Sequence, residues 1–325
     1  MTETADRQDR DPPLRSPAPH TVPRPDYHVH LENYALDRAS LLRLIEAAAA
    51  AGVTEIGITE HAHNFVQCRT IYPPDNAWIH GRNVPGRRNW DVDAYFRLLD
   101  GARREGLPIR AAMEWDYCPG CERELERWIG AYDWDFALVG VHWIRGRSGG
   151  WWGFDIPAQR GEWERHAPQQ VYAEYFRLLC EAVQTGLFDV LAHPDVVKVF
   201  GHRPSGDMRD WHERVAAAAS CKGLCAEVNT AGWRKPVGEL YPSADLLAAL
   251  RSAGVPIVIS SDAHRIEHVG YAFERAEAIV LQAGYTTRCR FERRRRQEVP
   301  LLRPTPGLPP TKTPGPSKRD EPPSD

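Results

Sequence analysis

The sequence predicts an α/β protein in which seven strands close into a distorted (β/α)7, TIM-like barrel. Three observations lead to this fold class. Short apolar runs rich in β-branched residues alternate with longer segments of helical spacing, which is typical of a parallel sheet. The alternation fills one continuous stretch, 26–290, close to the size of one such barrel. No G-x-G-x-x-G follows the first predicted strand, which argues against a dinucleotide-binding sheet.

The individual elements follow from these patterns. The predicted strands are 26–31, 55–61, 109–115, 136–143, 189–194, 224–230 and 256–262. Residues 38–51 place Leu41, Leu44, Ile45 and Ala48 on one helical face, and Gly52 supplies a stop. Similar spacing predicts helices over 91–105, 168–185, 208–221, 243–253 and 270–283. Two longer loops, 62–90 and 144–167, each follow the C-terminal end of a predicted strand.

The two ends of the chain differ in composition from the middle. Residues 1–25 hold six prolines and residues 300–325 hold nine, so neither segment can bury enough apolar surface to offset the entropy of ordering. We therefore expect a disordered leader over 1–25, a barrel domain over 26–290, and a basic, then proline-rich disordered tail over 291–325. The four arginines Arg293–Arg296 are interpreted as a solvated helix end, with binding to an acidic partner as the alternative.

The composition excludes several classes of protein. The net charge of −3 and pI of about 6.5 give no basic field for nucleic acid or anionic lipid. No apolar run approaches the roughly 18 residues of a membrane span, and the first 25 residues lack the apolar segment of a secretory signal. Seven cysteines fit reduced thiols in the cytoplasm better than disulfides. A zinc site made of Cys118, Cys121, Cys221 and Cys225 is the less favoured alternative, and the oligomeric state stays open.

Every predicted strand ends in a polar or metal-binding side chain. In chain order these are His28, His30, Glu60, His61, Glu114, His142, His193, Asn229, Asp262 and His264. The C-terminal ends of barrel strands meet at one face, which carries the active site in this architecture. His28 and His30 are two residues apart on one strand, so both can face the barrel mouth and hold one cation. Converging imidazoles and carboxylates suit Zn, Mn or Fe.

These groups exceed the needs of one tetrahedral site. A bridging acid such as Glu114 would let two or three ions lie side by side, and ions about 3.5–4 Å apart are typical of phosphate ester hydrolysis. Glu60 and Asp26 are interpreted as residues that orient the metal ligands. The remaining histidines, His63 among them, are given no ligand role. The tryptophans after the fourth strand are interpreted as packing residues, or else as a wall for a flat cationic substrate.

Seven short stretches, taken in order, resemble the motifs of the PHP (polymerase and histidinol phosphatase) superfamily. They are D-Y-H-V-H at 26–30, E-H at 60–61, M-E-W-D-Y at 113–117, G-V-H-W at 140–143, L-A-H-P-D at 191–195, N-T-A-G-W-R-K-P-V-G at 229–238 and S-S-D-A-H at 260–264. The segment at 229–238 points to the histidinol-phosphatase branch, which W-G-F-D-I-P at 152–157 and V-V-K-V-F-G at 196–201 support. The resemblance covers about 26–285.

The resemblance implies a centre of two to three divalent transition-metal ions (Zn, Mn or Fe). By this resemblance, one ion is held by His28, His30, Glu114 and Asp262. A second is held by Glu114, His142 and His193, and a third by His61 and His264. The third ion needs a further acid from the stretch 31–37, for which Asp37 is preferred over Glu32, although Asp37 is also placed to cap a helix. Glu114, Asp262 and His264 are the expected catalytic residues.

The implied reaction is the hydrolysis of L-histidinol phosphate to L-histidinol and phosphate, a step of histidine biosynthesis. A metal-activated water would attack phosphorus in line, while cations neutralise charge on the phosphoryl oxygens. Arg234 and Arg203 are candidates to bind the phosphate of this small-molecule monoester through a planar fork of donors, with surface ion pairs as the alternative interpretation.

Three alternatives to this function are considered. The first is another phosphoesterase of the superfamily, acting on a phosphotyrosine or a nucleotide. The second is an amidohydrolase, which is disfavoured because that class places a carbamylated lysine where this chain has His142. The third is a non-catalytic metal-binding or regulatory protein, which turnover would distinguish from an enzyme.

Overall fold

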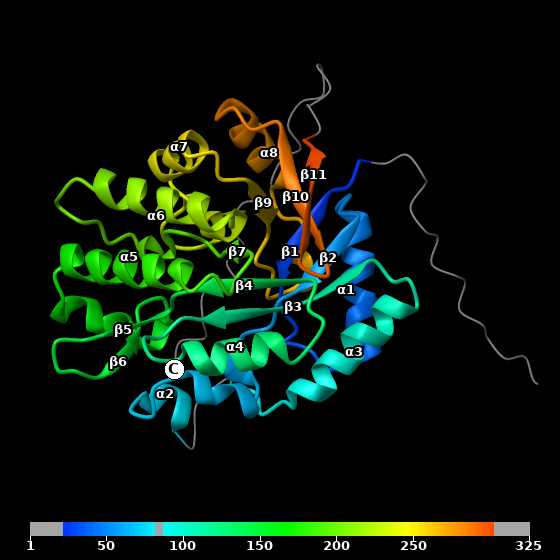
Figure 1. Ribbon diagram of the computed structural model, residues 1–325, viewed down its shortest axis with the longest axis horizontal. Coiled ribbons are helices and arrows are strands. Elements are labelled where there is room, and N and C mark those ends of the chain that lie inside the picture. Colours follow the sequence, from blue (N-terminus) through cyan, green and yellow to red (C-terminus); the bar gives the residue numbers. More distant parts are fainter. Residues whose placement is uncertain (1–21, 82–86, 302–325) are drawn as a thin grey trace, which may run out of the picture.

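The computed structural model describes residues 22–81 and 87–301. Seven parallel strands form one sheet in the order β1-β2-β3-β4-β7-β8-β9 (Figure 1). Their bounds are β1 (Pro25–Val29), β2 (Glu55–Ile58), β3 (Ile109–Asp116), β4 (Phe136–Gly140), β7 (Val190–Leu191), β8 (Cys225–Asn229) and β9 (Ile257–Ser260). All seven predicted strands are therefore confirmed, mostly with shorter bounds than expected.

The sheet closes on itself between its first and last strands. Val29 forms a parallel bridge with Ala263, just beyond β9. The amide of His30 donates to the carbonyl of Ala263 at 2.9 Å, and the amide of Ala263 donates to the carbonyl of His28 at 3.1 Å. Because this closing bridge is short and β7 has only two residues, the structure confirms a distorted seven-stranded barrel rather than a regular one.

Helices cover the outside of the barrel. They are α1 (Arg38–Ala50), α2 (Ala77–His80), α3 (Val92–Arg104), α4 (Glu122–Gly130), α5 (Pro168–Gln184), α6 (Arg209–Lys222), α7 (Ala244–Ser252) and α8 (Phe273–Gln282). The six predicted helices are confirmed. Two helices were not predicted: α2, which is a single turn, and α4, whose short apolar stripe is confined to Leu125, Trp128 and Ile129. None of the helices in the described ranges is long and apolar enough to cross a membrane.

The long loops carry additional structure. The second of them folds into an antiparallel hairpin of β5 (Trp143–Arg145) and β6 (Trp151–Gly153), followed by a 3₁₀ segment, η3 (Pro157–Arg165). In Figure 1 this hairpin lies on the side toward which the arrows of β3 and β4 point. The loop is thus an ordered structure at the C-terminal face of the barrel.

The seven cysteines are free thiols. Cys118 and Cys121 lie together, since the amide of Cys118 donates to the sulfur of Cys121 at 3.3 Å. Cys225 is buried in the barrel whereas Cys221 is exposed on α6. No cysteine belongs to a cluster of potential metal ligands in the described part of the chain, in keeping with the preference for free thiols over a zinc site.

The interior of the barrel has an apolar base below a polar mouth. Ten buried residues fill the base: Tyr27, Ala112, Phe136, Leu138, Val190, Ala192, Cys225, Val258, Cys289 and Phe291. Side chains two residues apart on a strand face the same side. The next inward positions on β3 after Ala112 are therefore Glu114 and Asp116, and β4 continues from Leu138 through Gly140 toward His142. The strands thus carry the polar groups directly above a packed apolar floor.

A C-terminal hairpin completes this floor, which corrects the expected boundary at 290. β10 (Thr287–Glu292) pairs antiparallel with β11 (Arg295–Pro300). Cys289 and Phe291 of β10 enter the apolar base. The amide of Phe291 donates to the hydroxyl of Tyr27 at 3.0 Å. In Figure 1 the hairpin lies near the point where the arrows of β3 and β4 begin.

The expectation that Arg293–Arg296 ends a helix, and that a disordered tail begins at 291, is wrong for this segment. Arg293 and Arg294 have φ values of 47° and 62°, and they form the tight turn of the hairpin. Arg294 is also paired with Asp189 at 2.6 Å. The alternation of charged and apolar residues in T-R-C-R-F-E at 287–292 was the missed signal for a strand. Residues 1–21 and 302–325, also expected to be disordered, lie outside the described residues.

Replacing Phe291 with alanine should destabilise the protein, because it empties the base of the barrel. Phe291 is 2% exposed and contacts Tyr27 and Phe136, with ring centroids 6.2 and 5.7 Å away. We expect a loss of about 3–5 kcal/mol in the free energy of unfolding, measured by urea denaturation. Glu292→Ala removes an exposed side chain from the same strand and is the control. Equal stability of the two variants would show that the hairpin does not support the barrel.

Candidate metal centre

The carboxylate of Glu114 lies at the centre of the polar mouth. It projects from β3 and is 1% exposed. Its Oε1 atom faces the histidines that follow β4 and β7: Nε2 of His193 is 2.9 Å away and Nε2 of His142 is 3.4 Å away. These two imidazole nitrogens are 3.4 Å from each other. Oε1 of Glu114 and these two nitrogens are therefore three potential ligand atoms that lie close to one another.

The other oxygen of Glu114 faces a different set of histidines. Oε2 is 2.8 Å from Nδ1 of His61, 3.2 Å from Nε2 of His28 and 3.7 Å from Nε2 of His30. One carboxylate thus presents each of its oxygens to a separate group of imidazoles. This is the geometry required of an acid that bridges two neighbouring cations.

A bulge in β1 aims its histidines into the mouth. The pairing of β1 with β2 shifts register between Asp26 and Val29. Such an irregularity changes the side to which the following residues point. Tyr27 consequently packs in the apolar base while its neighbour His28 also faces inward and reaches Glu114.

Two further carboxylates hold the histidines in orientation. Oε1 of Glu227 lies 2.8 Å from Nδ1 of His28, and Oδ1 of Asp116 lies 2.5 Å from Nδ1 of His142. In both histidines this leaves Nε2 directed at Glu114 and free to bind a cation. Neither acid was predicted from the sequence. The available signal was spacing, because Asp116 is two residues after Glu114 and Glu227 two before Asn229.

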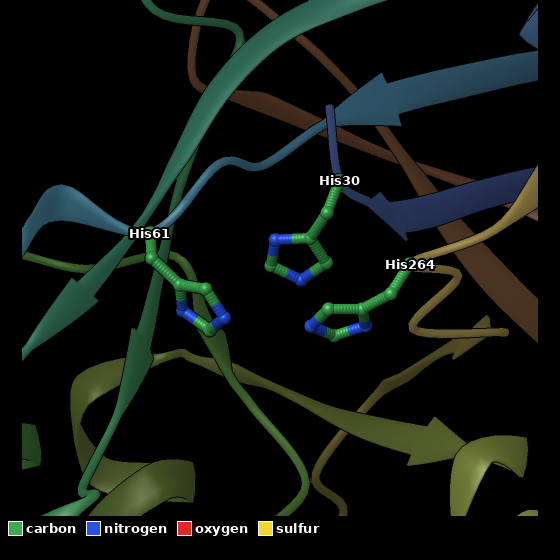
Figure 2. Close-up of side chains that lie close together, drawn as sticks. All are labelled: His30, His61 and His264. Carbon is green, nitrogen blue, oxygen red and sulfur yellow. The ribbon is translucent and has the colours of Figure 1, made fainter. Parts of the chain in front are cut away.

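Asp262 and His264 reach the cluster from the segment after β9. Oδ1 of Asp262 is 3.3 Å from Nε2 of His30 and 3.6 Å from Nε2 of His28. Figure 2 shows His30, His61 and His264 pointing toward one another. Asn229 is not directed at the histidines, because its amide nitrogen donates to Asp262 Oδ2 at 3.2 Å and to Glu227.

Backbone strain marks two of the predicted site residues. His193 and Asp262 have φ values of 23° and 51°, in the left-handed region that L-residues rarely adopt. The amide of His193 is held by Glu227 Oε2 at 2.6 Å, and the carbonyl of Asp262 accepts from Arg234 at 3.1 Å. Such strain is concentrated at functional sites in proteins.

The structure does not bring Asp37 to the cluster, so this predicted ligand is wrong. Asp37 is exposed and caps α1, where its carboxylate accepts from the amide of Ser40 at 2.8 Å. Glu32 lies nearer the histidines instead: its Oε1 is 3.6 Å from Nε2 of His264. The turn over 32–34 sets which acid faces inward, and the sequence carried no periodic pattern to predict it.

Glu60 and Asp26 support the site from behind. Glu60 is buried and accepts hydrogen bonds from the amides of Leu31 and His61, which fixes the loops beneath two histidines. Asp26 accepts from the amide of Ser261 at 2.9 Å and thereby anchors the segment before Asp262. Both residues touch the backbone around the cluster, which agrees with the orienting roles expected for them.

Gly140 is required by the closeness of these groups. A Cβ atom at this position would lie 2.6 Å from Cε1 of His142 and 3.1 Å from Oε1 of Glu114. Any side chain would therefore displace one of the two. The glycine of G-V-H at 140–142 leaves the room in which this imidazole and carboxylate face each other.

The two predicted phosphate-binding arginines differ in their surroundings. Arg234 is half-buried at the end of η5 (Thr230–Arg234), and its Nη2 donates to the carbonyls of Ser261 and Asp262 at 2.8 and 3.1 Å. Its guanidinium also lies over the ring of Tyr271. Arg203 is exposed and ion-paired with Glu239. The structure therefore places Arg234 beside the cluster, whereas Arg203 forms a surface ion pair.

The electrostatics of the cluster fit bound cations. Although burial alone would raise it, the imidazoles of His61, His28 and His142 hold the pKa of Glu114 well below its usual value. Burial disfavours a charge on His30, yet Asp262 and Glu60 raise its pKa to about 10. Burial and the charge on His30 lower the pKa of His264 to about 3. The ring centroids of His30 and His264 are 4.1 Å apart, so a proton on His30 disfavours a proton on His264.

Three buried imidazole nitrogens that form no hydrogen bond in the described part of the chain point to the same conclusion. Both ring nitrogens of His30 and Nδ1 of His193 are buried without a hydrogen-bond partner among the described residues. Three groups of side chains bring ligand atoms within 4.8 Å of one another: His30 with His61 and His264, His28 with His30 and Asp262, and His28 with Glu114 and His193. Nitrogen and carboxylate donors of this kind fit Zn, Mn or Fe.

Comparison with known proteins identifies the family. Residues 26–231 match the model of the PHP domain. This chain belongs to the PHP domain family. Within the family it groups with the histidinol-phosphatases: it is 37% identical to a probable histidinol-phosphatase of Deinococcus radiodurans over 266 residues, which are 81% of this chain and 94% of the relative. The histidinol-phosphatase of Bacillus subtilis is 23% identical over 72% of this chain and 91% of its own length.

Solved structures share the fold of this PHP domain. The histidinol phosphate phosphatase of Lactococcus lactis, crystallised with zinc, L-histidinol and phosphate, superposes with a TM-score of 0.62 at 20% identity, covering 85% of this chain and all of that one. A putative histidinol phosphatase of Listeria monocytogenes gives a TM-score of 0.60 at 18% identity, covering 78% of this chain and 99% of that one. Both structural similarities support the assignment of the barrel fold.

Replacing Glu114 with glutamine should abolish stable metal binding in this PHP domain. The substitution preserves shape but removes the negative charge between the two sets of imidazoles. We expect the affinity for Zn or Mn to fall by more than about 100-fold, since loss of groups that merely orient ligands already costs 10- to 100-fold. Elemental analysis and calorimetric titration measure this. Asp37→Asn, which retains a helix cap, is the control and should bind metal normally; unchanged metal content in Glu114→Gln would contradict the bridging role.

Proposed function

We propose that this protein is a histidinol-phosphatase, which hydrolyses L-histidinol phosphate to L-histidinol and phosphate and so serves histidine biosynthesis. The observation that carries the proposal is the carboxylate of Glu114 held between two sets of histidine nitrogens. The relatives named histidinol-phosphatase, matched over more than nine-tenths of their length, support this choice of substrate. The free, mostly buried thiols fit a reducing compartment, and we place the enzyme in the cytoplasm.

We assign two to three divalent ions to the cluster, with Zn, Mn or Fe as candidates. His28, His30, Glu114 and Asp262 would hold one ion, and Glu114, His142 and His193 a second. His61 and His264 would hold the third, now with Glu32 in place of Asp37. When bound, such ions supply positive charge for the phosphoryl oxygens and lower the pKa of a water molecule.

The side chains themselves determine where the substrate is held. Glu227 and Asp116 fix the rings of His28 and His142, so that the mouth is already shaped before substrate enters. Arg234 is tied to the backbone beside Asp262 and carries a planar guanidinium that suits a phosphate. His264 is the most exposed of the proposed ligand residues, followed by Glu32, His61 and Asp262. Nδ1 of His264 lies 3.4 Å from Oδ1 of Asp262.

The activity is tested by phosphate release from a panel of monoesters. Protein supplied with Zn, Mn or Fe should release phosphate from L-histidinol phosphate with a higher kcat/KM than from phosphotyrosine or nucleoside monophosphates. Removal of the ions with a chelator should abolish turnover, and their return should restore it. Preference for phosphotyrosine or a nucleotide would favour another phosphoesterase of the family. No turnover by protein that retains its metal would favour a non-catalytic role.

Replacing Arg234 with alanine should impair catalysis without removing metal. We expect kcat/KM to fall by about 10- to 1,000-fold, equivalent to roughly 1.4–4 kcal/mol, because a bidentate contact to the phosphate is lost. Lysine at this position should restore only part of the activity. Arg203→Ala is the matched control and should stay within about threefold of the wild type, since Glu239 holds its guanidinium. If Arg203→Ala has the larger effect, the two assignments are reversed.

A further inference from the structure

One acidic side chain at the mouth is not accounted for by the proposed ligand sets. Asp155 follows β6 in the ordered loop over the C-terminal face. Its side chain is 21% exposed, and Oδ2 lies 3.9 Å from Nε2 of His142. Its other oxygen, Oδ1, is buried and has no hydrogen-bond partner in the part of the chain that the structure describes.

The position of Asp155 is fixed by its neighbours. The amide of Phe154 donates to the carbonyl of His142 at 3.3 Å, which ties this turn to the end of the barrel strand. The indole nitrogen of Trp163 donates to the carbonyl of Phe154 at 2.8 Å. Gln159 accepts from the amide of Gly153 at 2.8 Å. The backbone immediately before Asp155 is therefore tied both to the barrel and to η3, which places the carboxylate beside the cluster.

Asp155 lacks the partner that its charge requires. Within the described ranges its only ion-pair neighbour is His142. Nδ1 of His142 faces Asp116 at 2.5 Å, and its Nε2 lies 3.4 Å from Glu114 Oε1 and 3.4 Å from Nε2 of His193. At 3.9 Å, Asp155 Oδ2 lies beyond hydrogen-bond distance of His142. A half-buried carboxylate without a donor is costly unless a ligand supplies the positive charge.

We propose that Asp155 binds the ammonium group of the substrate and thereby selects phosphate esters of amino alcohols. This inference rests on the proposed function. In L-histidinol phosphate the ammonium stands on the carbon next to the ester carbon, so a phosphate held over the cluster carries it to the rim of the mouth. Asp155 lies on that rim, beside the His142 side of the cluster. A charge-assisted bond from the ammonium would pair both groups.

The experiment compares Asp155→Asn with the wild type on two substrates. L-Histidinol phosphate carries the ammonium, and phenyl phosphate does not. For L-histidinol phosphate we expect kcat/KM to fall by about 10- to 100-fold, mainly through KM, the range for loss of a hydrogen bond to a charged group. For phenyl phosphate the change should stay within about threefold. Asp155→Ser, which removes the carboxylate without adding an amide, should show the same pattern.

Inhibition gives a second readout. The inhibition constant of L-histidinol should rise in Asp155→Asn by a factor similar to that for KM, whereas that of its deamino analogue, an imidazolyl propanol, should not change. Glu164→Gln removes an exposed charge from the same loop and is the matched control. It should behave as the wild type with both substrates and both inhibitors.

Several outcomes would overturn the inference. Loss of metal from Asp155→Asn would make this residue a ligand, and an equal loss of activity on both substrates would make it part of the general machinery. Wild-type discrimination in both variants would leave Asp155 without a role in selection. If the wild type hydrolyses phenyl phosphate but not L-histidinol phosphate, the proposed function itself is wrong and the inference fails with it.

Discussion

The buried carboxylate of Glu114 is the interaction on which the rest of the site depends. An anion with 1% exposure is unfavourable unless positive charge surrounds it. Five histidines from four strands provide nitrogen atoms within 3.7 Å of its two oxygens. Imidazoles can meet this need either by taking protons or by sharing cations with the carboxylate. Because the rings of His30 and His264 are stacked, protonation of one disfavours protonation of the other. The arrangement is therefore suited to metal ions.

Holding so many polar groups inside a barrel requires a stable floor. The apolar base separates the charged mouth from solvent at the opposite end, and the β10–β11 hairpin contributes Phe291 and Cys289 to it. The two layers share the same strands, since inward positions change from apolar to polar along β3 and β4. A substitution that loosens the packing of the base would therefore displace the polar side chains above it, even though it alters no ligand residue.

The strand ends and the surrounding loops contribute different groups to the site. The strand ends fix the groups that can hold cations, because neighbouring strands restrict both backbone and side chains. The loop after β4 and its hairpin bring Asp155 to the rim, and η5 brings Arg234. Groups that bind phosphate or the alcohol part of a substrate can thus vary in loops while the cluster stays unchanged, as is common in barrels of this type.

The sequence by itself determined the barrel and most of the cluster, because both depend on local periodicity. Alternating apolar runs predicted the seven strands, and the polar residues at their ends predicted which histidines meet. The tertiary structure decided the rest. Asp37 and Glu32 both lie in an irregular turn, so only the folded chain shows that one caps a helix and the other approaches His264. The spacing of Glu227 and Asp116 is compatible with inward positions on their strands, but only the folded chain shows which histidine each of them contacts.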